Sequence, residues 1–270
     1  MNDSLNILEI NHQIINSDEL IPLLTSYQML PQLLREMIID KSISQWEDST
    51  NIPINFTHEE INRVQAQFFK QQQITNAAQE TAWLERHGMT KTQLTSLTTR
   101  KLRIEKFQQA TWGHKLESYF LQRKKDLDRV VYSMLRTQDA GIIQELYFRI
   151  QADEHSFAQL AKTYSIGPEA HTNGIVGAVE MGTLHRSLAK QLQVSQPGQL
   201  WQPTRFGEYF VIIRLEKLLP AQLDVFMRQR LLRELFEVWL QDKIQQLPAS
   251  ERAWLVSKHT VEQIDRKTVA

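Results

Sequence analysis

Apolar residues recur at helical spacing through most of the first 127 residues. Over residues 20–38 and 94–127 they return every three or four positions, which is typical of helices with one buried face. Pro31 interrupts the first stretch and predicts a kink or two separate helices. Thr57 and Glu60 have the spacing of a capping box, which predicts a helix start. We therefore expect residues 1–127 to form a helical region.

From residue 128 the period of the pattern changes. The run Val130–Leu135 is compact and β-branched, as in a strand, and two further strands are predicted near 200–206 and 208–217. Asn173-Gly174 and Pro197-Gly198 are turn dipeptides. The helical patterns in this part of the chain fall at about 139–150, 154–164 and 185–193. Together with a strand after Asn173-Gly174, the order β-α-α-β-α-β-β predicts a small domain with helices packed on a short sheet.

The helical period returns after Pro220. Its apolar face is wide and contains Phe226, Phe236 and Trp239, too much apolar surface to stay in water. This face either packs on residues 1–127 or binds another chain. The predicted fold class is therefore α+β, and the predicted parts are residues 1–127, 128–219 and 220–270.

Composition narrows the class of protein. The 270 residues are 41% hydrophobic and 23% charged, as in globular proteins, and they include no cysteine, which excludes disulfides and thiolate chemistry. No apolar run approaches the roughly 20 residues of a membrane span. The first residues lack a basic segment followed by an apolar one, so we expect no secretory signal and a cytoplasmic location.

Charge is unevenly distributed although the net charge is zero. Residues 1–83 carry 4 Lys or Arg against 11 Asp or Glu, and residues 84–130 carry 11 against 5. One interpretation is nucleic-acid binding by the basic stretch. The other is that these cations lie on solvated helix faces and complement the acidic segment, which we favour because no aromatic stacking platform accompanies them. The candidates for such contacts are seven of the 11 cations: Arg100, Lys101, Arg103, Lys106, Arg123, Lys124 and Lys125.

The middle of the chain resembles the parvulin family of peptidyl-prolyl isomerases. The resemblance depends on four segments taken in order: Ser156–Ser165, Asn173–Gly177, Leu192–Pro203 and Gly207–Leu215. A helical region, this module and a returning amphipathic helix together are similar in layout to foldase chaperones of the SurA type. That layout implies a helical chaperone body made from both ends of the chain, with the isomerase module inserted.

The resemblance also implies positions for the site. The histidine of the first strand falls on Ser133, the acid or thiol on Ile175, and the histidine of the last strand on Val211, or on Phe210 if the register slips by one. The side chains expected at the proline-binding pocket are Leu184, His185, Leu188, Phe206 and Glu208. The pocket thus stays apolar, whereas the polar groups of the family are replaced.

Three hypotheses follow. The chain is a prolyl isomerase acting on unfolded or proline-containing polypeptide clients, or it is a chaperone or adaptor that keeps the parvulin scaffold and binds such clients with weakened chemistry. Nucleic-acid binding through residues 84–130 is the remote alternative. No cofactor or metal is expected, because no histidine pair has metal-ligand spacing on one helix and no glycine-rich phosphate loop occurs.

Overall fold

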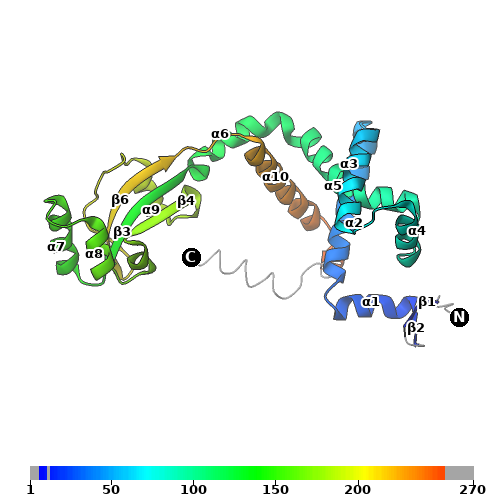
Figure 1. Cartoon of the computed structure of the whole chain (residues 1–270), viewed down its shortest axis with the longest axis horizontal. Helices are drawn as coiled ribbons and strands as arrows, with labels where there is room; N and C mark the ends of the chain where they lie inside the picture. The colour runs from blue at the N-terminus through cyan, green and yellow to red at the C-terminus, as the bar shows by residue number, and fades with distance from the viewer. Residues whose placement is uncertain (1–5, 11–12, 253–270) are drawn as a thin grey trace. The chain divides into compact units, whose positions relative to one another are not determined.

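The computed structural model describes residues 6–10 and 13–252, which form two compact units (Figure 1). One unit contains the described residues up to His114 together with those from Arg230 onwards. The other contains Lys115–Gln229. The strands of this second unit begin at Arg129 and end at Leu219, close to the predicted module limits of 128 and 219. The domain limits inferred from the sequence remain a prediction.

Both ends of the chain contribute to the first unit, which is mainly helical. Pro31 lies in the first turn of a helix, where a missing backbone donor costs nothing, so the expected interruption separates two helices. Thr57 and Glu60 form the predicted capping box. The elements are β1 (Asn6–Ile10), β2 (Gln13–Asn16), α1 (Ser17–Ser26), α2 (Leu30–Thr50), α3 (His58–Gln71), α4 (Ala77–Arg86), α5 (Lys91–Trp112), most of α10 (Val225–Gln245), and α11 (Ala249–Arg252).

The core of this unit is centred on Phe107 of α5, which is fully buried. Its ring lies 5.1 to 5.5 Å, centroid to centroid, from those of Trp46, Trp112 and Trp239. The buried cluster draws on α2, α5 and α10: Ile39, Ile43, Phe107, Phe236 and Leu240. The apolar face of α10 is therefore covered by helices of the same chain at Phe236, Trp239 and Leu240. Phe226, which was predicted to be covered as well, is exposed. The predicted apolar patch at Trp254–Val256 lies outside the described residues.

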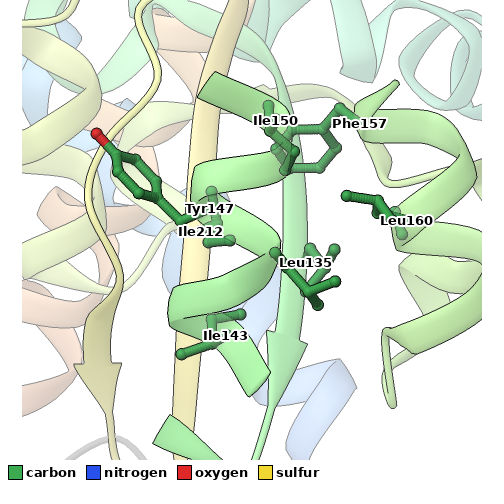
Figure 2. Close-up of a cluster of buried hydrophobic side chains, with 9 residues drawn as sticks. Leu135, Ile143, Tyr147, Ile150, Phe157, Leu160 and Ile212 are labelled. Carbon is green, nitrogen blue, oxygen red and sulfur yellow. The ribbon is translucent and has the colours of Figure 1, made fainter. Parts of the chain in front are cut away.

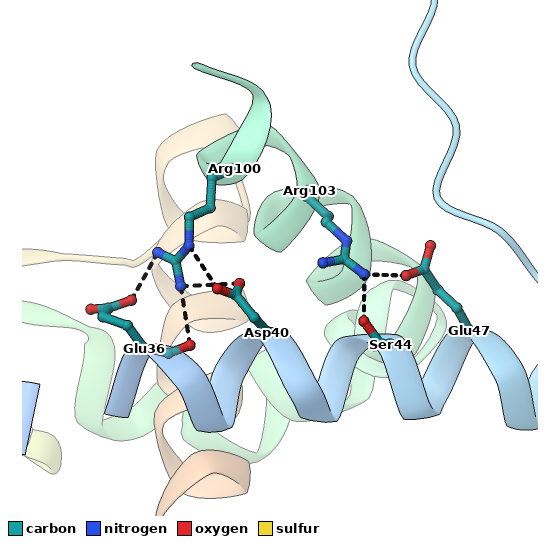
Figure 3. A network of polar contacts seen from close by, with 6 residues as sticks. All are labelled: Glu36, Asp40, Ser44, Glu47, Arg100 and Arg103. Atoms are coloured by element: carbon teal, nitrogen blue, oxygen red, sulfur yellow. Dashed lines mark hydrogen bonds and ion pairs between the residues drawn. The ribbon is translucent and has the colours of Figure 1, made fainter. Parts of the chain in front are cut away.

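Ion pairs join the basic helix α5 to the acidic helices α2 and α3, as Figure 3 shows for α2. The pairs are Arg100 with Glu36 and Asp40 (2.8 and 3.1 Å), Arg103 with Glu47, and Lys106 with Glu60 (2.7 Å). For these cations the structure confirms that they complement the acidic segment. Cations that already have carboxylate partners are poor candidates for phosphate contacts.

The second unit has the predicted order β-α-α-β-α-β-β. Its four strands form one antiparallel sheet in the order β4-β3-β6-β5. The α+β fold class is thus confirmed. The elements are η1 (Gly113–Lys115, at the unit boundary), α6 (Leu116–Leu127), β3 (Arg129–Thr137), α7 (Ala140–Gln151), α8 (Phe157–Tyr164), η2 (Pro168–Thr172), β4 (Ile175–Glu180), η3 (Met181–Thr183), α9 (Arg186–Gln193), β5 (Thr204–Phe206) and β6 (Tyr209–Leu219).

Helices α7 and α8 cover one face of this sheet (Figure 2). The inward residues of α7 recur every three or four positions and meet Leu135 of β3 and Ile212 of β6. Asp139 begins α7, since its carboxylate accepts hydrogen bonds from the backbone N–H groups of Gly141 and Ile142 (2.7 and 2.9 Å). The buried cluster on this face is Leu135, Ile143, Leu146, Tyr147, Ile150, Phe157, Leu160, Ala161 and Ile212.

The other face is covered by α9 and the short helix η3. Because side chains alternate along a strand, β3 and β6 supply a second set of residues here. Its buried cluster is Val130, Tyr132, Met181, Leu188, Leu192, Val211, Ile213 and Leu215. This cluster carries the candidate site.

We predict that Phe107→Ala destabilises the helical unit by about 3–5 kcal/mol, because it leaves a cavity among three tryptophan rings. Urea unfolding followed by tryptophan fluorescence measures the change. The matched control is Leu97→Ala on the same helix, where the side chain is exposed and the expected loss is below about 1 kcal/mol. Equal losses in the two variants would contradict this description of the core.

Candidate functional site

The register between β3 and β6 determines which side chains share a face. Arg136 lies opposite Val211, and Ser133 lies opposite Arg214. Directly opposed residues of an antiparallel pair point to the same side of the sheet. Arg136 and Val211 therefore face α9, together with the cluster around Leu188, whereas Ser133 and Arg214 face α7 and α8.

An apolar surface lies on the α9 side of the sheet. We call Leu184, Leu188, Phe206 and Val211 the apolar surface. Leu188 and Val211 are buried and form its floor, while Leu184 and Phe206 are half-buried beside them. The structure thus brings together three of the predicted pocket residues and one predicted family position.

His185 and Glu208 are the polar residues predicted at this surface, and both are exposed. The His185 ring meets the Phe206 ring edge-on, at 6.0 Å between centroids. Its Nδ1 lies 2.7 Å from Ser187 Oγ. Glu208 lies in the turn between β5 and β6, next to Gly207, whose φ of +61° suits that turn. His185 is therefore beside the apolar surface, whereas Glu208 is not among the residues that pack in this cluster.

Ser133 lies on the opposite face from the apolar surface. It is buried, and its Oγ donates a hydrogen bond of 2.5 Å to Glu216, which also accepts one of 2.8 Å from Arg214 Nε. The Arg214 guanidinium in turn lies over the ring of Phe157 of α8, 5.2 Å from its centroid. Ser133 thus belongs to a polar cluster under α8, and the structure does not bring it to Val211.

Ile175 begins β4 directly opposite Ser133. Half of its surface is exposed, and it is not part of the cluster that contains Leu184 and Leu188. The predicted site residues therefore separate into two groups on different faces of the sheet. Ser133 and Ile175 form one group, and the apolar surface with His185 forms the other.

A buried ion pair lies next to the apolar surface, and it was missed in the sequence. Arg136 donates two hydrogen bonds to Glu169, from Nε to Oε1 (2.8 Å) and from Nη2 to Oε2 (2.7 Å). Ser165 Oγ donates a further one to Glu169. Glu169 lies in η2, between α8 and β4, so the pair ties this connection to β3. The available signal was that Arg136 follows Tyr132 and Met134 at every second position of the strand, which places a charge on a face that is otherwise apolar there.

The environment of Glu169 decides its ionisation. Burial by itself raises the pKa of this carboxyl, but the hydrogen bonds from Arg136 and Ser165 outweigh burial and lower the pKa below its ordinary value. Burial, followed by the negative charge of Glu169, raises the pKa of Tyr132. Glu169 is therefore an anion at neutral pH, paired in two hydrogen bonds with a planar cation.

Two kinds of feature are absent from the part of the chain that the structure describes: metal-ligand clusters and membrane-spanning helices. Over residues 6–10 and 13–252, no three histidine or acidic side chains are arranged to ligate a metal ion. Over the same ranges, no helix combines the length and the apolar character that crossing a membrane requires.

Part of the chain matches a known protein family, and the chain is similar at low scores to several solved structures. Residues 133–217 match the family "Rotamase: PPIC-type PPIASE domain". None of the curated protein sequences matches the chain. Among solved structures, the peptidylprolyl isomerase PrsA of Bacillus cereus is 19% identical, with a TM-score of 0.44, and the match covers 94% of this chain and 90% of that one.

Two further structures are similar at lower scores. The parvulin domain of PpiD from E. coli is 25% identical over 36% of this chain and 95% of its own, with a TM-score of 0.31. A structure from Campylobacter jejuni, described under the names PEB4 and Cj1289 as SurA-like chaperones, is 12% identical. It covers 91% of this chain and 99% of that one, with a TM-score of 0.34.

We predict that Glu169→Gln costs about 2–3 kcal/mol at neutral pH, because it weakens two charged hydrogen bonds and leaves Arg136 without its counter-ion. The pKa of Glu169 in the folded state lies below the ordinary 4.5, so the ionised carboxylate stabilises the fold at pH values above 4.5. This stabilisation is lost as the pH falls through the lowered pKa. The difference between wild type and variant should therefore shrink in acid. Urea unfolding at several pH values measures it.

Glu145→Gln is the control, because this exposed carboxylate pairs with Arg149 on α7. It should cost less than about 0.5 kcal/mol at any pH. A Glu169→Gln loss that is equally small would mean that the buried pair does not hold the connection between α8 and β4.

Proposed function

Because residues 133–217 form a parvulin-type peptidyl-prolyl isomerase domain, we propose that this protein is a foldase that binds proline-containing segments of polypeptide clients and speeds their isomerisation. The observation that carries the proposal is the convergence of Leu184, Leu188, Phe206 and Val211 on one apolar surface. A proline ring that packs against the half-buried side chains of Leu184 and Phe206 would be removed from water.

Prolyl isomerisation requires few chemical groups from the protein. Rotation about the X-Pro bond is opposed by amide resonance, with a barrier of about 18–20 kcal/mol, and no covalent bond has to form or break. Resonance places charge on the amide oxygen and nitrogen, so an environment that removes water from the bond favours the twisted state. The apolar surface supports this role without a nucleophile or an acid.

A second candidate is a client-binding chaperone or adaptor with little turnover. Ser133 stands at a position where the family carries a histidine, and it is engaged with Glu216 on the far face of the sheet. Ile175 and Val211, at the other two family positions, are apolar. These observations favour binding over catalysis.

The helical unit supports client binding in either case. In α1, α2 and their connection, large apolar side chains are left exposed, and such groups are typical of interaction surfaces. They are Ile21, Tyr27, Met29, Leu33 and Met37. Extended, unfolded segments of a client fit this surface by their own apolar side chains. The identity of the clients and the cytoplasmic location remain predictions, and nucleic-acid binding is not proposed because several of the basic residues are paired.

We predict that Leu184→Asp weakens binding of an Ala-Ala-Pro-Phe peptide to the full chain at least tenfold, because a carboxylate beside the proline ring must lose water. Isothermal titration or fluorescence anisotropy measures the affinity. Ile142→Asp is the matched control, since Ile142 is exposed on α7 across the sheet. An unchanged affinity in Leu184→Asp would place the peptide elsewhere.

Turnover on the same peptide separates the two candidates. The isomerase proposal expects wild type to accelerate cis-trans exchange, measured by NMR exchange spectroscopy, and Leu184→Asp to lose most of that acceleration. If wild type binds the peptide firmly but the exchange rate equals the uncatalysed rate, the isomerase proposal is wrong and only the client-binding function is supported.

A further inference from the structure

We propose that Arg136 is the hydrogen-bond donor that the site presents to a backbone carbonyl of the bound polypeptide. The inference rests on the proposed function, because it assigns a residue to the same site. It adds a polar contact that none of the predicted site residues supplies.

Arg136 is positioned beside the apolar surface. Arg136 lies directly opposite Val211, the buried floor of the apolar surface. The central carbon of its guanidinium is 5.6 Å from the centroid of the Tyr209 ring, and Tyr209 packs against the same cluster as Leu184 and Phe206. A chain whose proline ring contacts the apolar surface therefore passes within reach of this side chain.

The Arg136 side chain has hydrogen-bonding capacity left for a ligand. A guanidinium has five N–H donors. Arg136 uses two of them on Glu169, and no other acceptor among the described residues takes a hydrogen bond from its side chain. A quarter of the side chain is exposed. Donors therefore remain for a ligand.

The charge next to Arg136 selects the kind of acceptor that it can bind. The Glu169 carboxylate is almost completely buried and paired with Arg136 by two hydrogen bonds. It balances the charge of Arg136 locally, so a second anion gains little attraction at this place. A neutral, strongly polar acceptor such as a peptide carbonyl fits better than a carboxylate or a phosphate. Carbonyl oxygens occur in every polypeptide, so this contact does not restrict client sequence.

The surroundings of the Arg136–Glu169 pair hold the guanidinium in place. A Cβ atom at Gly167 would lie 2.1 Å from Arg136 Nε and 2.3 Å from Glu169 Oε2, so a glycine at this position leaves the space in which the pair is seated. Ser165 holds Glu169 from the other side. A donor fixed before the ligand arrives loses little conformational entropy on binding.

The first test compares Arg136→Gln with the control Arg149→Gln in the full chain. Arg149 also pairs with a glutamate but lies on α7, across the sheet. With Ala-Ala-Pro-Phe as the probe, we expect about tenfold weaker binding in Arg136→Gln, about 1.4 kcal/mol by the usual conversion, and no change in Arg149→Gln. An affinity unchanged in both variants overturns the proposal.

The second test uses the charge balance. Wild type should bind Ala-Ala-Pro-Phe, Ala-Glu-Pro-Phe and Ala-Lys-Pro-Phe with affinities within about twofold of each other. In Glu169→Gln the cation is uncompensated, so Ala-Glu-Pro-Phe should now bind several-fold more tightly than Ala-Lys-Pro-Phe. A purely structural pair would weaken all three peptides equally, and that result overturns the proposal.

The third measurement needs no variant and therefore does not depend on folding. The Nε–H resonance of Arg136 in wild type, followed by NMR during titration with Ala-Ala-Pro-Phe, should shift with the same saturation as the backbone resonances of Leu184. Binding that moves Leu184 but not Arg136 contradicts the proposal and leaves the proposed function standing. If wild type binds none of the three peptides, both fail.

Discussion

The pairing of β3 with β6 is the interaction on which the site depends. The two central strands run antiparallel over nearly their whole length, and their register determines which residues of each strand face α9. Because side chains alternate, a slip of one residue would exchange the two faces. Arg136 and Val211 would then no longer share a face, and neither would Ser133 and Arg214. Two apolar cores, one on each face, hold the register.

Each face of this sheet carries a polar cluster. The two clusters differ in whether their charged groups are fully used by contacts within the domain. Under α8, Ser133 and Arg214 converge on Glu216, and the arginine lies against Phe157, so this cluster is occupied by contacts within the domain. On the α9 face, Glu169 orients Arg136 while part of the guanidinium stays exposed. Buried charges cost free energy unless they are paired, which explains why both arginines have carboxylate partners.

The helical unit depends on complementary charge as well as on its aromatic core. Helix α5 is basic, and the helices that precede it are acidic, so charges that are uneven along the sequence become paired in space. Two opposing effects act on the pKa of Glu47 in this unit. Burial raises the pKa, but the hydrogen bonds from the Ile54 amide and from Arg103 more than offset burial and leave the pKa lowered. Helix α10 joins this unit from the later part of the chain, because its Phe236 and Leu240 pack with Phe107 of α5.

The amino-acid sequence by itself determined the elements and their order, because apolar period, capping residues and turn dipeptides are local signals. The capping box at Thr57, the helix break near Pro31 and the β-α-α-β-α-β-β order could all be predicted in this way. The resemblance of the middle segment to parvulins also placed Leu184 and Leu188 on one apolar surface. Which of the family positions share a face was decided only by the tertiary structure. Ser133 and Val211 are far apart in sequence, and only the strand register, set by two cores, places them on opposite sides of the sheet. The Arg136–Glu169 pair was also decided only by the tertiary structure, because the two residues belong to separate elements and meet only when η2 packs beside β3.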